Sequence, residues 1–128
     1  MADFRVIIAG SRTFNDYDTL KEKCNLVLSN KRKDNNIIII SGGARGADLL
    51  GENYAKEEKF GLEVFPAQWK KFGKSAGFRR NEQMAEVADA LIAFWDGNSH
   101  GTKHMIDIMK NKNSLVKVVY FNNATSNK

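Results

Sequence analysis

Residues 36–41, NIIIIS, form an almost unbroken run of β-branched side chains, and this run stops at Gly42 and Gly43. Four further short apolar runs occur along the chain, at residues 4–9 (FRVIIA), 62–65 (LEVF), 90–95 (ALIAFW) and 115–121 (LVKVVYF). Runs that are continuously apolar, rather than alternating with polar residues, are typical of strands covered on both faces in a parallel sheet. The sequence therefore predicts five buried strands.

Apolar residues spaced three and four apart lie between these runs. They form four stripes: Tyr17, Leu20, Cys24, Val27 and Leu28; Ala47, Leu50 and Tyr54; Met84, Val87 and Leu91; Met105, Ile108 and Met109. Such stripes are typical of amphipathic helices that cover a sheet. Strands alternating with helices predict an α/β protein, a three-layer Rossmann-like or flavodoxin-like sandwich around a mainly parallel five-stranded sheet.

Length and composition limit the classes of protein. The chain has 128 residues, of which 42% are hydrophobic, and this predicts one domain over residues 1–128 with a flexible polar tail at 122–128. No apolar run approaches the ~20 residues of a membrane span. The first residues do not resemble a secretory signal. We therefore expect a cytoplasmic protein with no membrane partner.

The net charge and the residue types that bind metals limit which partners and ions the chain is expected to bind. The formal net charge of +5 favours anionic partners such as nucleotides or nucleic acid. The single Cys24 excludes an internal disulfide and a cysteine-built zinc site. His100 and His104 share a helix face but lack a third ligand, so we expect no metal and no cofactor.

The loops after the first two strands carry the first half of a candidate site, because ligands of open parallel sheets bind beyond the carboxyl ends of the strands. The first loop contains Gly10, Ser11 and Arg12, and the second contains Ser41, Gly42, Gly43, Arg45 and Asp48. Glycines allow close backbone approach to a ligand, and unpaired amides at the start of a helix attract anions. The sequence matches neither the Walker A loop nor the dinucleotide-binding fingerprint.

The loop predicted after the third strand, residues 66–78 (PAQWKKFGKSAGF), mixes lysines with Trp69 and Phe72. This mixture suits phosphate contact with base stacking, and a solvent-facing loop with Trp69 packed on the body is the alternative. Arg80 follows in what we expect to be the first turn of a helix. It faces the strand ends while Arg79 turns away. A core-facing arginine needs an anionic partner.

The loop after the fourth strand supplies the other half of the candidate site. It contains Gly97, Ser99, Gly101 and Thr102, and it opens a helix. A glycine-containing turn at a helix start suits an anion or a sugar hydroxyl.

Three segments of the chain resemble a known family. They are ISGGARGAD (40–48), AGFRRNEQM (76–84) and DALIAFWDGNSHGTKHMI (89–106), and GSRTFNDYD (10–18) fits the same pattern. They resemble the SLOG superfamily of Rossmann-like proteins, most closely its YspA (cpYpsA-related) branch, common in bacteria and phages. The resemblance implies a nucleotide-derived ligand held by the glycine loops, and a homodimer.

The chain is more distantly similar to DNA-processing protein A and to LONELY GUY-type phosphoribohydrolases. An arginine-containing helix motif of these hydrolases resembles Arg80-Asn81-x-x-Met84, which implies that Arg80 handles a phosphate or ribose. They carry a glutamate three residues after a threonine that matches Thr102, and this chain has Met105 there. Asp48 and Arg80 remain the candidate catalytic residues.

We therefore predict a domain that binds a nucleotide or nucleotide-derived small molecule in order to sense, sequester or process it. Two alternatives stay open: a nucleotide N-glycosidic hydrolase and a single-stranded nucleic-acid-binding module. We expect Arg12, Arg45, Arg80 and Thr102 to contact phosphates, Asp48 a ribose hydroxyl and Trp69 a base. The predicted ligand-binding residues are Gly10, Ser11, Arg12, Ser41, Gly42, Gly43, Arg45, Asp48, Trp69, Arg80, Asn81, Gly97, Ser99, Gly101 and Thr102.

Overall fold

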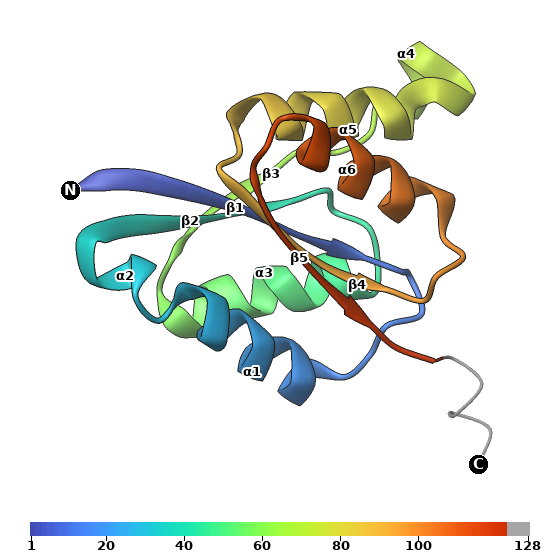
Figure 1. The fold of residues 1–128 in the computed structure, drawn as a ribbon. Coiled ribbons are helices and arrows are strands. Elements are labelled where there is room, and N and C mark those ends of the chain that lie inside the picture. Colours follow the sequence, from blue (N-terminus) through green and yellow to red (C-terminus); the bar gives the residue numbers. More distant parts are fainter. Residues whose placement is uncertain (123–128) are drawn as a thin grey trace.

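The computed structural model describes residues 1–122; the rest of the predicted tail, residues 123–128, lies outside the described part. Five strands form one sheet in the order β3-β2-β1-β4-β5, and every neighbouring pair is parallel (Figure 1). The strands are β1 (Ala2–Gly10), β2 (Asn35–Ser41), β3 (Gly61–Val64), β4 (Ala90–Trp95) and β5 (Leu115–Tyr120). All five predicted strands are confirmed, and their order is that of a Rossmann-like rather than a flavodoxin-like sheet. The prediction that all five are buried is wrong for the edge strands β3 and β5, which contain no buried residue because each has a neighbouring strand on one side only.

Helices cover both faces of this sheet, which confirms the three-layer sandwich (Figure 1). The long helices are α1 (Tyr17–Leu28), α3 (Ala47–Glu58), α5 (Ala76–Val87) and α6 (His100–Asn111). The short ones are α2 (Lys31–Asp34), α4 (Trp69–Phe72) and the 3-10 turn η1 (Gly73–Ser75). Helices α1 and α3 pack on one face and α5 and α6 on the other. No helix in residues 1–122 is both long and apolar enough to span a bilayer.

Successive residues of each central strand pack alternately into the two cores, one on each face of the sheet. In β1, Val6 and Ile8 belong to the core under α1 and α3, and Ile7 belongs to the core under α5 and α6. All three side chains are fully buried, as the continuous apolar run predicts. Cys24 is also fully buried, on the apolar stripe of α1.

The segment 66–78 is the main departure from the prediction. The sequence predicts a loop there, whereas the structure has α4 and η1, followed directly by α5. Helix α4 is a single turn, which is too short to show the apolar spacing that predicts a helix. The amides of Lys71 and Phe72 both donate to the Gln68 carbonyl and close this turn. Because α5 begins at Ala76, Arg80 lies in its second turn rather than its first.

The predicted stripe of α5 also extends too far. The helix ends at Val87, whose side chain is 44% exposed, and Leu91 belongs to β4. The Asp89 amide already donates to the Arg5 carbonyl, so the chain has joined the sheet before Leu91. Leu91 has the spacing of the α5 stripe only because an apolar strand residue happens to follow the end of the helix at that distance.

Strand β1 lies at the centre of the sheet and positions the functional loops. It pairs with β2 on one side, through Ile7 opposite Ile40, and with β4 on the other, through Gly10 opposite Phe94. The strand order therefore reverses between β1 and β4, which is where open α/β sheets bind ligands. The carboxyl ends of the three strands emerge side by side at this point.

Candidate functional site

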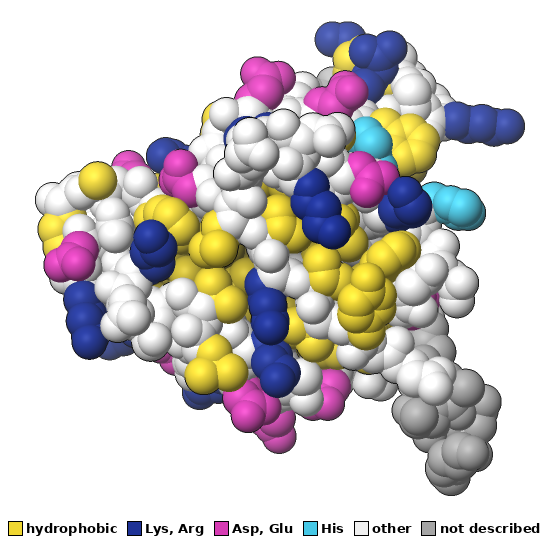
Figure 2. Space-filling view, viewed as in Figure 1, with side chains coloured by type: hydrophobic (Ala, Val, Ile, Leu, Met, Phe, Trp, Pro, Cys, Tyr) yellow, Lys and Arg dark blue, Asp and Glu magenta, His cyan; other side chains and the backbone are white. Residues whose placement is uncertain are grey.

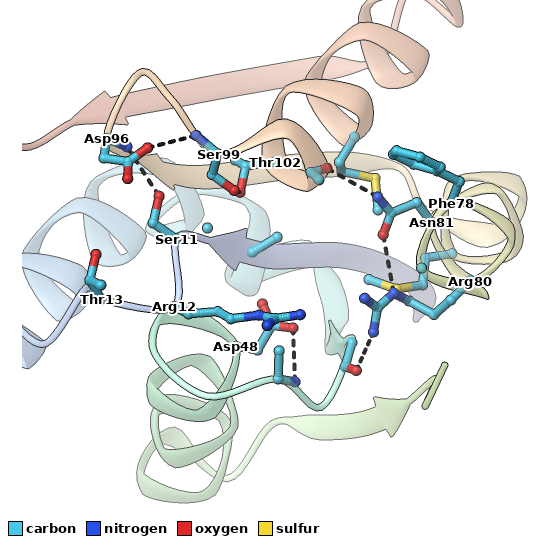
Figure 3. A pocket seen from close by; sticks show the side chains of 18 of the residues that line it. Ser11, Arg12, Thr13, Asp48, Phe78, Arg80, Asn81, Asp96, Ser99 and Thr102 are labelled. Atoms are coloured by element: carbon cyan, nitrogen blue, oxygen red, sulfur yellow. Dashed lines mark hydrogen bonds between the residues drawn. The ribbon is translucent and has the colours of Figure 1, made fainter. Parts of the chain in front are cut away.

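A cavity of about 450 Å³, the first cavity, lies at the carboxyl ends of β1, β2 and β4 (Figure 3). Its walls come from the segments after these strands, from α4 and η1, and from α5 and α6. A second cavity of about 470 Å³ adjoins it. The two share one wall, made by Arg12, Gly42, Ala44, Trp69 and Arg80.

The structure brings most of the predicted ligand-binding residues together around these cavities. The first cavity is lined by Gly10, Ser11, Arg12, Gly42, Asp48, Trp69, Arg80, Asn81, Ser99, Gly101 and Thr102. Gly43 and Arg45 line only the second cavity. Ser41 and Gly97 line neither. Ser41 is fully buried, and its hydroxyl donates to Glu52 at 2.7 Å. Ser41 therefore stabilises the loop between β2 and α3 without facing either cavity.

Arg80 stands at the shared wall and is held in place from two sides. Its Nη1 donates to the Gly42 carbonyl, and its Nε donates to Oδ1 of Asn81 at 3.1 Å. Burial lowers the pKa of the guanidinium, while the nearby Asp48 acts to raise it. Arginine stays charged in proteins, so a half-buried positive charge lines both cavities.

Asp48 is the buried carboxyl of the site, with 6% of its surface exposed. Its Oδ2 accepts a hydrogen bond from the Ala44 amide at 3.2 Å, which anchors the side chain to the loop before α3. Burial raises the pKa of Asp48 to about 6, against the opposing effects of that hydrogen bond and of Arg80 and Arg12. In Figure 3 the side chains of Arg12 and Arg80 extend toward Asp48 from opposite sides.

The loop between β2 and α3 uses several of its amides within the protein. The Gly43 amide donates to the Ser41 hydroxyl at 3.0 Å, and the Ala47 amide donates to the Ser11 carbonyl at 3.3 Å. With the Ala44 amide on Asp48, three of the amides expected to attract an anion are already engaged. The positive charge on this side of the first cavity therefore comes from guanidinium groups.

The opposite side of the first cavity, formed by the start of α6, is polar. The carboxylate of Asp96 accepts from the amides of Asn98 at 2.8 Å and Ser99 at 2.9 Å. Partial burial acts to raise the pKa of Asp96, but these hydrogen bonds outweigh it and lower that pKa. The hydroxyls of Ser99 and Thr102 lie 3.2 Å apart (Figure 3).

Asn81 connects α5 to α6 with its side-chain amide. Nδ2 donates to the Gly101 carbonyl at 3.1 Å and lies 3.2 Å from Nδ1 of His104. Together with the bond from Arg80, these contacts engage both ends of the amide. Asn81 therefore positions Arg80 relative to the start of α6.

Sequence reasoning missed several residues that line the first cavity. They are Ala9, Thr13, Ala44, Gly77, Phe78, Met84, Asp96 and Met105; Lys74, which also lines the cavity, belongs to the segment 66–78 whose lysines were expected to suit phosphate contact. Phe78 and Trp69 are aromatic residues of this wall, 46% and 53% exposed, and Phe78 packs edge-on against His104. The signal for Phe78 was its position three residues before Asn81 on one helix, which places both on the same face.

Metal ligands do not gather in the described residues. No group of three or more His, Cys, Asp or Glu side chains in residues 1–122 is placed to hold a metal ion. The ring of His104 instead contacts Asn81 and Phe78.

Comparison with known proteins gives a match to one family and to one phage protein. The sequence profile of the YspA, cpYpsA-related SLOG family matches residues 4–72. The chain is 37% identical over 106 residues to the Gene 61 protein of Mycobacterium phage D29, an alignment that spans 78% of this chain and 83% of that protein. No solved structure matches the chain. The profile match ends with α4, before the α5 and α6 wall of the first cavity.

Proposed function

The chain belongs to the YspA, cpYpsA-related SLOG family, and from this premise we propose that it binds a nucleotide or a nucleotide-derived small molecule in the first cavity. One observation carries the proposal: two guanidinium groups, those of Arg12 and Arg80, line a cavity beside the strand-order reversal of a parallel sheet. Its volume of about 450 Å³ fits the range of small-molecule sites.

Each part of a nucleotide has a matching group in the first cavity. Arg12, Arg80 and Lys74 offer charged donors to phosphate oxygens, and charge-assisted hydrogen bonds are the strong ones. The ring of Trp69 offers a face on which a base stacks. Asp48 offers a carboxyl acceptor to a ribose hydroxyl.

The hydroxyls of Ser99 and Thr102 provide a second polar position at the start of α6. They lie across the first cavity from the guanidinium groups (Figure 3). Backbone amides at a helix start favour an anion or an electron-rich oxygen. A ligand with a phosphate at one end and sugar hydroxyls at the other satisfies both sides.

The test is a thermal-shift screen of the whole chain against nucleoside phosphates, NAD derivatives and cyclic dinucleotides, followed by titration calorimetry of each stabilising compound. Binding to the native state raises the midpoint of unfolding by mass action. Arg12→Ala removes an exposed side chain and Arg80→Ala a half-buried one. Each should weaken binding about tenfold or more, since a charged hydrogen bond contributes ~1.5–3 kcal/mol.

Two further variants control this experiment. Arg45→Ala probes the second cavity alone, so it weakens binding only of a ligand that extends there. Lys33→Ala removes one exposed positive charge from α2, outside both cavities, and should leave the affinity unchanged. Unchanged affinity in folded Arg12→Ala and Arg80→Ala proteins would remove the proposal.

A further inference from the structure

The segment 66–79, the α4 lobe, carries a concentration of positive charge. It contains α4, η1 and the start of α5, and no acidic residue occurs between Glu63 and Glu82. Four cations of the lobe are exposed: Lys70, Lys71, Lys74 and Arg79. Figure 2 shows Lys and Arg side chains gathered at the end of the molecule that carries α4, with hydrophobic atoms between them.

The lobe cations are distinguished by their clustering rather than by a lack of ion pairs, because most Lys and Arg side chains in residues 1–122 form none. Ion pairs elsewhere join Arg5 to Glu63, Lys21 to Glu57, Arg32 to Glu58 and Lys103 to Asp107. Within residues 1–122, no cation of the α4 lobe forms an ion pair. The positive charge of the lobe is therefore not neutralised by ion pairs within residues 1–122 and can attract an anionic partner.

An aromatic ring orders two of these charges. The guanidinium of Arg79 lies 4.5 Å from the ring centre of Phe72, and the ammonium of Lys71 lies 5.1 Å from it. Nε of Arg79 also donates to the Ser75 hydroxyl at 3.1 Å. Cation–π contact holds the two groups on the lobe surface without neutralising their charge.

Two further rings of the lobe are exposed where it meets the first cavity. The side chains of Trp69 and Phe78 are 53% and 46% exposed, and both line that cavity. The Trp69 ring packs along the start of α5, with Cη2 3.7 Å from the position that a Cβ atom on Gly77 would take. The charged lobe and the cavity mouth therefore form one continuous surface.

We propose that the α4 lobe binds single-stranded nucleic acid, with its four exposed cations on the phosphates and the rings of Trp69 and Phe78 stacked on bases. Positive charge alternating with exposed aromatic rings is what an unpaired strand requires, because every unstacked base offers a flat face. A duplex hides those faces, and α4 is too short to enter a groove as a reading helix. An acidic peptide would use the charges but offers no flat faces to the rings, and an anionic membrane is the alternative that the vesicle measurement below tests. This function goes beyond the small-molecule binding proposed above.

The experiment measures binding of a fluorescent oligothymidylate of about ten nucleotides to the whole chain by anisotropy, over a series of salt concentrations. The double variant Lys70→Ala/Lys71→Ala should bind at least tenfold more weakly. Its plot of log affinity against log salt should be shallower by about 1.4, since each phosphate contact on a single strand contributes ~0.7 to the slope. Its matched control, Lys33→Ala/Lys56→Ala, removes the same charge from α2 and α3 and should bind within about twofold of the unmodified chain.

Stacking is tested separately. Trp69→Ala should weaken binding by about five- to 150-fold, the equivalent of ~1–3 kcal/mol for one stacked base. Trp69→Tyr keeps a ring and should restore most of the affinity. Equal affinity for duplex DNA, for poly-glutamate or for vesicles rich in phosphatidylserine would overturn the proposal, as would equal losses in the lysine variant and its control.

The two proposals fail separately. Lys70 and Lys71 line neither cavity, so their double variant should keep its affinity for any mononucleotide that the chain binds. Arg45→Ala and Lys70→Ala/Lys71→Ala therefore address different surfaces. A chain that binds oligothymidylate but no small nucleotide would retain the lobe proposal and refute the cavity proposal.

Discussion

Two glycine-containing loops flank the first cavity, and they are built in opposite ways. After β2, a Cβ atom on Gly42 would lie 2.6 Å from Nη1 of Arg80, and one on Gly46 would lie 2.5 Å from backbone oxygens. After β4, a Cβ atom on Gly97 or Gly101 would meet no other described heavy atom within 4 Å. The first loop is rich in glycine because other protein atoms occupy the space that a side chain would take. The second loop leaves that space open.

This difference changes how the two loops attract an anion. In the first loop, the amides of Gly43 and Ala44 bond to Ser41 and Asp48, so attraction depends on arginine side chains. In the second, the Asp96 carboxylate occupies the amides just before α6, and the helix itself begins at the cavity wall. The glycines of the first loop are therefore explained by internal packing, whereas those of the second leave room for a ligand.

The largest effect is expected for Gly46→Ala. The backbone of Gly46 has φ +81°, and a methyl group there would meet the carbonyls of Ser11 and Arg12. We expect a loss of ~3 kcal/mol or more in the free energy of unfolding, measured by urea titration, because strain and overpacking add. Gly97→Ala has a similar φ, +86°, but open space, so it should lose only ~1–2 kcal/mol. Equal losses would refute the contrast between the loops.

Asp48→Asn should alter the pH dependence of stability. Since the folded pKa of about 6 exceeds the unfolded value of 3.8, the unfolded chain ionises first as pH rises. The unmodified protein should therefore lose about 3 kcal/mol of unfolding free energy between about pH 3 and pH 7 through this group, with about two-thirds of the loss falling between pH 4 and 6. Asp48→Asn should flatten this part of the profile in urea titrations at several pH values. An unchanged decline in the variant would show that other groups cause it.

A smaller effect of opposite sign is expected at Gly101 in the first turn of α6. Gly101→Ala should raise the free energy of unfolding by up to ~1 kcal/mol, because alanine favours a helix and the site has room. The matched control is Gly51→Ala in α3, where a Cβ atom would lie 2.7 Å from Cγ2 of Ile8. That variant should be destabilised. A stabilised Gly51→Ala protein would mean that the packing of α3 on β1 is loose.

The smallest expected effect concerns turnover. Met105 lines the first cavity on the α6 side, is 1% exposed and has no ionisable group, so that wall offers no acid, base or nucleophile at this position. We expect no release of free base from nucleoside monophosphates during long incubation, followed by chromatography. Steady release would contradict this expectation. Loss of the release in Asp48→Asn would then identify Asp48 as the acting carboxylate.

The sequence predicted the sheet well because its signals are local. The central strands β2 and β4 are nearly continuous apolar runs, 36–41 and 90–95, which are typical of strands covered on both faces. The loops that follow β1, β2 and β4 meet at one edge of any parallel sheet with this order. The convergence of Arg12, Asp48 and Arg80 on the first cavity follows from that topology.

The remaining parts of the site depend on contacts between distant residues. No local pattern indicates that the Gly42 carbonyl accepts from Arg80, or that Asn81 joins α5 to Gly101. The turn at α4 escaped prediction because a single helical turn carries no periodicity. Its position sets where Trp69 faces; Trp69 was predicted as a ligand contact, whereas Phe78, the other aromatic residue of this wall, was not.

The central place of β1 has a consequence for the order in which the protein is assembled. Strands β1, β2 and β3 come first in the chain, whereas the other edge of β1 pairs with β4, so that Val6 lies opposite Ala90, 84 residues further along. A chain in which β4 has not docked leaves this edge of β1 unpaired, and unpaired apolar strand edges favour aggregation. Both walls of the first cavity exist only after this late docking. A small molecule that binds there would stabilise only chains in which β4 and α6 have docked, and so would favour the completed fold by mass action.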